Sequence, residues 1–389
     1  HSTGGSPVPR NRSNALGWLA ALLSLSLLLG ACGDDDTSPT DEETPAESGT
    51  DSGTDSGDED DFAAGADDEQ DAVGEDGGYE YASDVSSHRL VVEDICEINS
   101  ELDADSIDFD SVAAIYVDGM HSVNSDGSVR TLAGFASAPD RMHGFDEYYD
   151  SDTPIDDFVV AAIEGTGGFE GESDAVRRQG VQKGIQNQTM IAWVIHELNA
   201  ALAKAGDGSF DAEEGAPHNW DEAWAFYHGS APQCGPYATA DKRGADFGTL
   251  ADDGETSLAN EAILAAMNEG REALLAEDAD GAEAAADEVL RQVVIIYSQA
   301  TIKYAALVPE DLEAGDADTA RVHQAEGYAF FRVVEPILAD AGADVDAVEA
   351  VLSLENEPGV NGGVDEVRSA LQPAFDTLGI SDEDIGQLG

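Results

Sequence analysis

Residues 220–227 read Trp-Asp-Glu-Ala-Trp-Ala-Phe-Tyr, and their apolar side chains return at the three- and four-residue spacing of a helix face. The same spacing appears in seven further segments: 111–117, 155–163, 184–202, 258–275, 289–307, 328–338 and 364–378. Strand-like alternation is hard to find, and Gly and Asp separate the periodic segments. The sequence therefore predicts an all-α protein.

The stretch at 220–227 also has counterparts elsewhere in the chain. Residues 109–116 read Phe-Asp-Ser-Val-Ala-Ala-Ile-Tyr, and residues 326–331 read Glu-Gly-Tyr-Ala-Phe-Phe, which aligns with the last six residues of the stretch. Repeats of this length are too long for the units of a solenoid. We therefore expect two pseudo-repeated helical lobes and a partial third repeat, at about 106–210, 217–310 and 320–380.

The composition excludes several classes of protein. The chain has 389 residues with 82 Asp and Glu against 17 Lys and Arg, a formal net charge of −65. Binding of nucleic acid through its phosphates needs a basic face, which this chain does not offer. A polytopic membrane protein is excluded because the chain has one apolar run and it is short. With 42% hydrophobic residues, the chain is expected to bury a real core.

The N-terminal residues indicate export. Two arginines precede an apolar run at 15–29, which is too short to span a bilayer but has the length of a signal-peptide core. Small residues directly precede Cys32, so we expect residues 1–31 to be a lipoprotein signal peptide and Cys32 to carry the lipid. The protein would then be anchored to the bacterial cell envelope, facing the periplasm or the cell surface. The alternative is an ordinary secretory signal with an accidental cysteine.

An acidic segment follows the lipidated cysteine. Residues 33–80 are rich in Asp, Glu, Gly, Ser and Thr and contain no Lys or Arg. Charge repulsion and the scarcity of apolar residues prevent such a segment from forming a packed core. We therefore predict a disordered tether at 32–87 and a helical domain at 88–389.

Two of the three cysteines remain after lipidation of Cys32. Cys96 and Cys234 belong to an exported domain, and an oxidising compartment favours a disulfide between them. The competing interpretation is two buried free thiols, because sequence alone gives no distance between them.

Motifs for enzyme chemistry are absent from the sequence. It has no Gly-x-Ser-x-Gly, no phosphate-binding P-loop, no His-Glu-x-x-His and no Cys-x-x-Cys. We therefore expect a protein that is not an enzyme.

His143, His218 and His323 each have an acid three residues later, a spacing that can chelate a metal from one helix face. The alternative is an acid near a helix N-terminus, followed by core aromatic residues.

Six short segments carry a family resemblance through their order along the chain: 115–116, 129–135, 184–188, 220–227, 240–243 and 326–332. In this order they resemble the low-iron-inducible periplasmic iron-assimilation proteins of algae, the Fea family, over roughly residues 90–380. The resemblance implies iron uptake at the cell surface, with relatives discussed as transferrin-like binders of ferric ion. The lipoprotein signal departs from the algal pattern and indicates a bacterial version.

Ferric ion is a hard cation that prefers phenolate and carboxylate oxygens, with occasional imidazole. The repeats place Tyr116 and Tyr227 at matched positions and align Glu222 with Glu326. We expect Glu222, Tyr227 and Glu326 to line one pocket. The predicted metal ligands are Glu222, Tyr227, Glu326, Tyr116, His143 and His196. The alternative for Tyr116 and Tyr227 is a half-buried core tyrosine with its hydroxyl at the surface.

A basic residue follows the first helical segment of each repeat: Arg130 in the first and Arg243 in the second. A guanidinium group can hold carbonate or a carboxylate through two hydrogen bonds, and a bound carbonate would complete the ligand shell of a ferric ion. The alternative is that each arginine pairs with a nearby surface acid.

The sequence therefore predicts a lipid-anchored iron-binding protein whose partners are iron, the membrane and an iron transporter, with no nucleic acid. Two other classes stay open. One is an imelysin-like, iron-regulated helical lipoprotein, although the Gly-x-His-x-x-Glu motif of that family has no clear counterpart here. The other is a structural surface lipoprotein without metal, whose charge reflects a saline habitat.

Overall fold

The predicted helices form where the periodic segments lie. A computed structural model of the chain describes residues 74–139 and 141–389. All eight periodic segments fall within helices, and the one sheet among the described residues is a two-stranded hairpin. The all-α prediction is confirmed. Among the described residues, none of the helices combines the length and apolar content needed to cross a bilayer.

The first part of the fold contains β1 (Glu75–Asp76), β2 (Tyr79–Glu80), α1 (Ser86–Arg89), α2 (Val91–Leu102), α3 (Phe109–Asp118), α4 (Leu132–Ala136), α5 (Phe145–Tyr149), α6 (Pro154–Glu164) and η1 (Gly167–Phe169). The middle contains α7 (Asp174–Lys183), η2 (Gly184–Thr189), α8 (Met190–Gly206), α9 (Ala216–Tyr227), η3 (Pro232–Cys234) and α10 (Pro236–Phe247). The last part contains α11 (Leu258–Leu275), α12 (Ala279–Ala314), α13 (Ala317–Asp340), α14 (Val345–Leu352), α15 (Val364–Leu378) and α16 (Asp382–Ile385).

Short polar side chains and glycines set the limits of the long helices. The side chains of Ser257, Asp278 and Asp316 accept hydrogen bonds from backbone N–H groups in the first turns of α11, α12 and α13. These bonds satisfy donors that have no partner within the helix. Gly315 and Gly379 end α12 and α15 in the left-handed conformation, which glycine adopts without a steric penalty.

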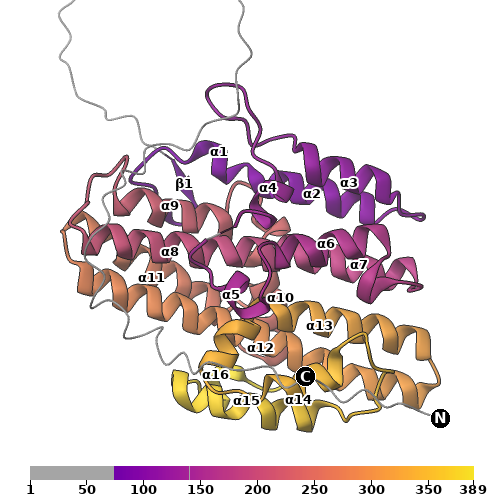
Figure 1. Ribbon diagram of the computed structural model, residues 1–389. Coiled ribbons are helices and arrows are strands. Elements are labelled where there is room, and N and C mark those ends of the chain that lie inside the picture. Colours follow the sequence, from indigo (N-terminus) through magenta and orange to yellow (C-terminus); the bar gives the residue numbers. More distant parts are fainter. Residues whose placement is uncertain (1–73, 140) are drawn as a thin grey trace, which may run out of the picture. The chain divides into compact units, whose positions relative to one another are not determined.

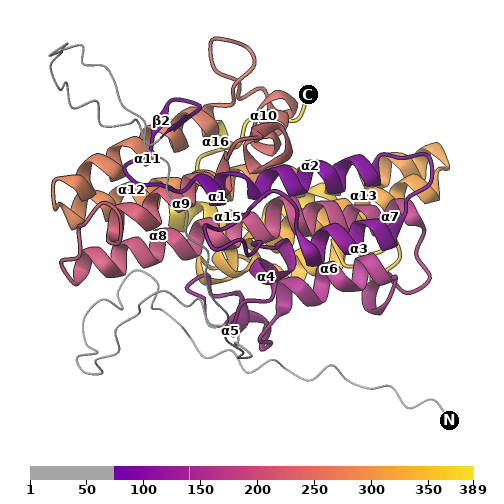
Figure 2. The ribbon, with the colours of Figure 1, turned by 90° about the horizontal axis from the view of Figure 1, so that it is seen from above.

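The helices pack in antiparallel pairs and layers. Helix α8 packs against α9, α11 against α12, and α12 against α13. The N-terminal helices α2 and α3 lie beside α6 and α7, while α14 and α15 cover α12 and α13 (Figure 1). The turned view in Figure 2 shows α7 next to α13. Close packing requires Gly270 on α11, because a Cβ atom there would lie 1.9 Å from the ring of Trp220 on α9.

A helical rod formed by α7, η2 and α8 runs through the middle of these layers. Its centre, η2, is one π-helical stretch, a feature often found at functional sites. All of its residues are buried, including Gln186, Asn187 and Gln188. The side-chain oxygen of Asn187 accepts hydrogen bonds from the hydroxyls of Tyr297 (2.9 Å) and Thr239 (2.8 Å). Buried amides therefore tie the rod to α10 and α12.

The disulfide predicted from the two remaining cysteines is present. Cys96 on α2 is bonded to Cys234 on η3, with 5.3 Å between their Cα atoms. It joins segments separated by 138 residues. Cys32, the signal peptide and most of the predicted tether lie outside the described residues.

The domain begins earlier than predicted. The structured part starts by residue 74 rather than at 88, because Tyr79 is completely buried. Its hydroxyl donates to Asp221 on α9 at 2.6 Å, and the backbone N–H groups of Ala82 and Ser83 donate to the same carboxylate. The acidic composition of 33–80 concealed this short segment.

The sequence repeat stays a prediction, since the residues that it aligns lie in different surroundings.

Candidate functional site

Glu222 lies at the centre of a buried cluster of carboxyl groups and imidazoles. His218 and Glu222 stand one turn apart on α9, and His88 comes from α1. The Nε2 atoms of His88 and His218 lie 3.3 Å and 3.2 Å from the same oxygen of Glu222. Glu197 on α8 is 4% exposed and hydrogen-bonds to both Glu222 and Asn219. Glu222 therefore has the polar surroundings expected of a functional residue.

The charges of this cluster follow from burial and proximity. Burial and the neighbouring negative charge of Glu222 raise the pKa of Glu197 well above its ordinary value. Burial opposes ionisation of Glu222, but the charges and hydrogen bonds of His88, His218 and Glu197 together lower its pKa to about 2. Glu197 is therefore the protonated member of the carboxyl pair and Glu222 the ionised one. The hydrogen bond to Glu222 raises the pKa of His218.

Replacing Glu197 by glutamine should stabilise the protein at alkaline pH. The folded state holds a proton on Glu197 that the unfolded chain releases above the ordinary glutamate pKa, so the wild type loses stability as pH rises through that window. The advantage of the variant should grow by about 1.4 kcal/mol per pH unit until the folded-state pKa is reached. Urea unfolding across the pH range checks this, with the exposed Glu214→Gln as control. An advantage that does not change with pH would contradict the assignment.

His143 and His196, which the sequence predicted as metal ligands, accept backbone hydrogen bonds through Nδ1 in this structure. The backbone N–H of Phe145 donates to Nδ1 of His143 at 3.2 Å, and that of Met142 donates to Nδ1 of His196 at 2.9 Å. A neutral ring that accepts at Nδ1 carries its proton on Nε2, so neither ring has a free lone pair. Burial lowers the pKa of both histidines to about 4.

The pocket predicted from Glu222, Tyr227 and Glu326 does not form. The hydroxyl of Tyr227 donates to Asn260 at 2.6 Å, whereas Glu222 contacts His88 and His218. Tyr116, its counterpart in the proposed repeat, instead donates to Asp156 at 2.7 Å. Both tyrosines are fully buried core residues with hydrogen-bonded hydroxyls, rather than half-buried residues with hydroxyls at the surface.

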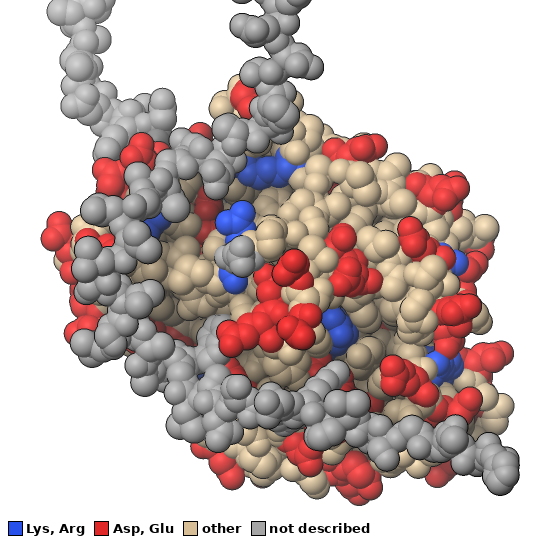
Figure 3. Space-filling model, in the orientation of Figure 1, with Lys and Arg blue, Asp and Glu red and all other residues tan. Residues whose placement is uncertain are grey.

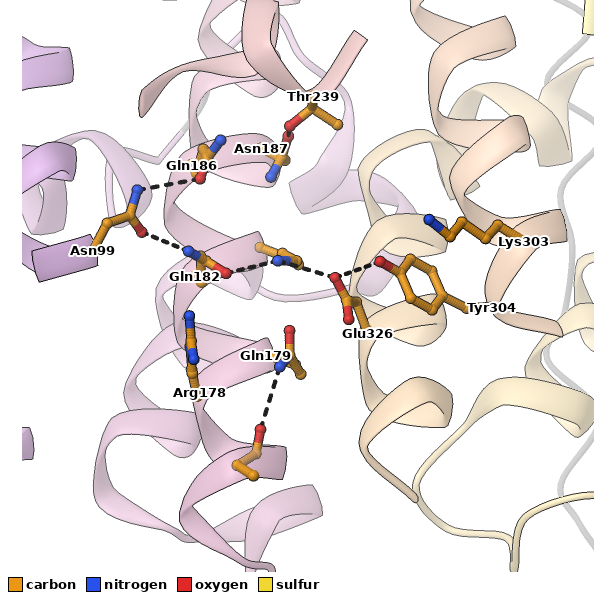
Figure 4. A network of polar contacts seen from close by, with 12 residues as sticks. Asn99, Arg178, Gln179, Gln182, Gln186, Asn187, Thr239, Lys303, Tyr304 and Glu326 are labelled. Atoms are coloured by element: carbon orange, nitrogen blue, oxygen red, sulfur yellow. Dashed lines mark hydrogen bonds and ion pairs between the residues drawn. The ribbon is translucent and has the colours of Figure 1, made fainter. Parts of the chain in front are cut away.

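Glu326 belongs to a separate network that crosses four helices. One of its oxygens lies 3.1 Å from Nζ of Lys183 on α7 and accepts the Tyr304 hydroxyl at 2.7 Å. Lys183 also donates to Gln182, which donates to Asn99 on α2. Figure 4 shows this line of contacts from Asn99 to Tyr304. The positive charge of Lys183 beside this oxygen disfavours a metal cation at Glu326.

The two predicted anion-binding arginines also differ from one another. Arg130 donates through Nη1 to the hydroxyl of Ser87 at 2.7 Å. Arg243 is buried on α10 and pairs through Nη2 with Asp246 at 2.9 Å. They do not occupy equivalent positions, so the repeat does not extend to an anion site.

A second oxygen cluster was not predicted. Adjacent tyrosines on α5 converge on one glutamate of α13: Tyr148 donates to Oε1 of Glu335 at 2.8 Å, and Tyr149 donates to Oε2 at 2.6 Å. Glu335 is completely buried. The guanidinium of Arg332 lies 4.3 Å from the centre of the Tyr149 ring. Burial raises the pKa of Tyr149 well above its ordinary value, while the nearby Arg332 charge acts in the opposite direction.

A hollow of about 470 Å³ lies beside these tyrosines and shares α5 with them. It is lined by Arg141, Gly144, Asp146, Glu147, Asp150, Ser151 and Asp152. Figure 3 shows acidic side chains gathered in this region of the surface. Four carboxylates around one hollow favour the approach of a cation.

Within the described part of the chain, no group of three or more His, Cys, Asp and Glu side chains is arranged to hold a metal ion. A metal site there would therefore need other donors, and the phenols of Tyr148 and Tyr149 are such donors. The fold and this cluster define a helical, very acidic protein with phenol and carboxylate oxygens suited to hard cations.

The chain belongs to the family of low iron-inducible periplasmic proteins (Fea1), whose family model matches residues 63–388. The resemblance noted from six short segments is thereby confirmed, together with a periplasmic, iron-related class of protein. No curated protein and no solved structure matches the chain.

Proposed function

We propose that this protein binds ferric iron outside the cytoplasm for iron assimilation, and that Tyr148, Tyr149 and Glu335 are the ligands that the protein supplies to the ion. The observation that carries the proposal is the convergence of two adjacent phenols on both oxygens of one buried carboxylate. Membership of a family named for its induction by low iron supports the same function.

The chemistry of the cluster suits ferric ion. Phenolate and carboxylate are hard oxygen donors, and a ferric ion between them would replace the two phenolic protons that now hydrogen-bond to Glu335. Binding should therefore release protons and weaken as pH falls. The Arg332 charge near the Tyr149 ring favours the phenolate form. Water or a co-bound anion such as carbonate would supply the remaining ligands, and titrations with and without bicarbonate separate these two sources.

Changing Tyr148 and Tyr149 together to phenylalanine should abolish iron binding. We expect the full-length wild type, titrated with ferric nitrilotriacetate, to bind one iron per chain with a visible tyrosinate-to-iron charge-transfer band. The double variant should lose both the band and the stoichiometric iron, because phenylalanine keeps the ring and removes the ligand oxygen. Helical content should stay the same by circular dichroism.

Two further variants make the iron experiment specific. Tyr237→Phe on α10 is the matched control and should keep both signals. Glu222→Gln combined with Tyr227→Phe tests the ligand set predicted from the sequence, and we expect it to keep the iron as well. One-to-one binding with an intact band in the Tyr148/Tyr149 variant would rule out this site, and loss of iron in the Glu222/Tyr227 variant would favour the other one.

The proposal includes anchoring through a lipid on Cys32 and delivery of iron to a transporter. The apolar run followed by small residues and Cys32 supports the anchor. Replacing Cys32 by serine should move the protein from the membrane fraction to the soluble fraction of the cell envelope, and an unchanged membrane fraction would contradict the anchor.

A further inference from the structure

The few lysines of this acidic chain are concentrated in one place. The sequence has four lysines, and Lys183, Lys242 and Lys303 gather around Arg243 although they come from α7, α10 and α12. Lys303 and Arg243 share the carboxylate of Asp246, at 2.8 Å and 2.9 Å. The charges of Lys242 and Arg243 both act on the pKa of Lys183. Four of the 17 basic residues of a chain with a net charge of −65 are therefore brought together from three helices.

Three of these cations face the same pair of aromatic rings. Tyr304 and Phe330 stack with their ring centres 5.8 Å apart. Arg243 lies 5.6 Å and 5.8 Å from the two ring centres, Lys183 lies 5.4 Å from that of Phe330, and Lys303 lies 5.8 Å from that of Tyr304. The three charged groups therefore all lie against the same aromatic pair.

Two of the guanidinium nitrogens of Arg243 have no hydrogen-bond acceptor among the described residues. Its side chain is buried, with the residue 6% exposed, and neither Nε nor Nη1 finds an acceptor among the described residues. A buried donor without an acceptor costs stability unless a ligand or water satisfies it. Among the described residues, ion pairs join these three cations to only two carboxylates, Glu326 and Asp246.

We propose that Arg243, Lys183 and Lys303 form a binding site for a small oxyanion, separate from the tyrosine cluster and independent of iron. Negatively charged oxygens would satisfy the free guanidinium nitrogens and balance the third positive charge. The site has a route to solvent, because Lys303 and Asp246 are 21% and 26% exposed at its edge. Lys242 is exposed beside it and would attract the anion from solution.

Titration of the iron-free, full-length protein with inorganic phosphate tests this proposal. At constant ionic strength, isothermal titration calorimetry should show saturable binding to the wild type, with a rise in the unfolding temperature. Arg243→Gln should weaken phosphate binding by roughly tenfold or more, because it removes a charge-assisted hydrogen bond. The matched control is Arg291→Gln, which removes the same charge from an ion pair with Glu288 and Asp384 and should leave phosphate affinity unchanged.

The outcomes separate the anion site from general charge effects and from the iron proposal. If Arg243→Gln does not fold, Lys303→Gln at the exposed edge provides the same measurement. Absence of saturable phosphate binding to the wild type, or an equal loss of affinity in Arg291→Gln, would overturn the site. Since no iron is present, neither result depends on whether Tyr148 and Tyr149 bind ferric ion.

Discussion

Replacing Cys96 and Cys234 together by alanine is expected to lower the free energy of unfolding by about 5 kcal/mol. The disulfide closes a loop across 138 residues of sequence. In the chain-entropy model, a cross-link over a loop of this length strongly restricts the unfolded chain and therefore stabilises the folded state. Cys234 is also buried, at 8% exposure, so the bond joins α2 and η3 at the edge of the core.

Urea unfolding followed by circular dichroism measures this effect. Reduction of the wild type with a thiol should lower the unfolding midpoint to the same extent as the double substitution. Cys32→Ala is the matched control, because it removes the third cysteine, which lies outside the described residues. An unfolding midpoint that stays the same in Cys96→Ala/Cys234→Ala would show that the cross-link does not limit the unfolded chain.

Helical periodicity located eight helical segments, but it missed α2 and α14 although both bury an apolar stripe. It did not reveal α7, whose sequence Asp-Ala-Val-Arg-Arg-Gln-Gly-Val-Gln-Lys is mostly polar. This helix is held by tertiary packing instead: Gly180 lies against Phe169 so closely that a Cβ atom there would be 2.3 Å from the ring. Its buried Gln179 has no place in an apolar pattern. A local pattern cannot anticipate contacts of this kind.

In the candidate sites too, the sequence indicates individual residues but not their partners, which lie far away in the chain. Tyr148 and Tyr149 stand out as neighbours in an acidic segment, but their partner Glu335 is 186 residues from Tyr149. Glu222 was predicted to be functional, yet its partner His88 comes from α1, a segment assigned to the boundary of the tether. Alignment of Glu222 with Glu326 matched two glutamates and missed that Lys183 neutralises one of them. Spacing identifies donors, whereas the fold decides their partners.

Acidification should destabilise the protein between the ordinary histidine pKa of 6.5 and about 4, because burial lowers the pKa of His88, His143 and His196 to about 4. In this window the unfolded chain takes up protons that the folded state excludes, so stability falls as pH falls. Each histidine accounts for a loss on the order of 3 kcal/mol. His218 and Glu197, whose pKa values folding raises, act in the opposite direction.

Asparagine substitutions assign this loss to individual histidines. In His143→Asn and His196→Asn, the amide oxygen can accept the backbone N–H that now bonds to Nδ1, while the titrating group is gone. Each variant should show a shallower decline of unfolding free energy with falling pH in urea titrations. The surface variant His121→Asn, whose side chain is 32% exposed, should keep the wild-type slope. Equal slopes in all four proteins would mean that these rings are protonated in the folded state, and that their Nδ1 atoms do not accept the backbone hydrogen bonds described here.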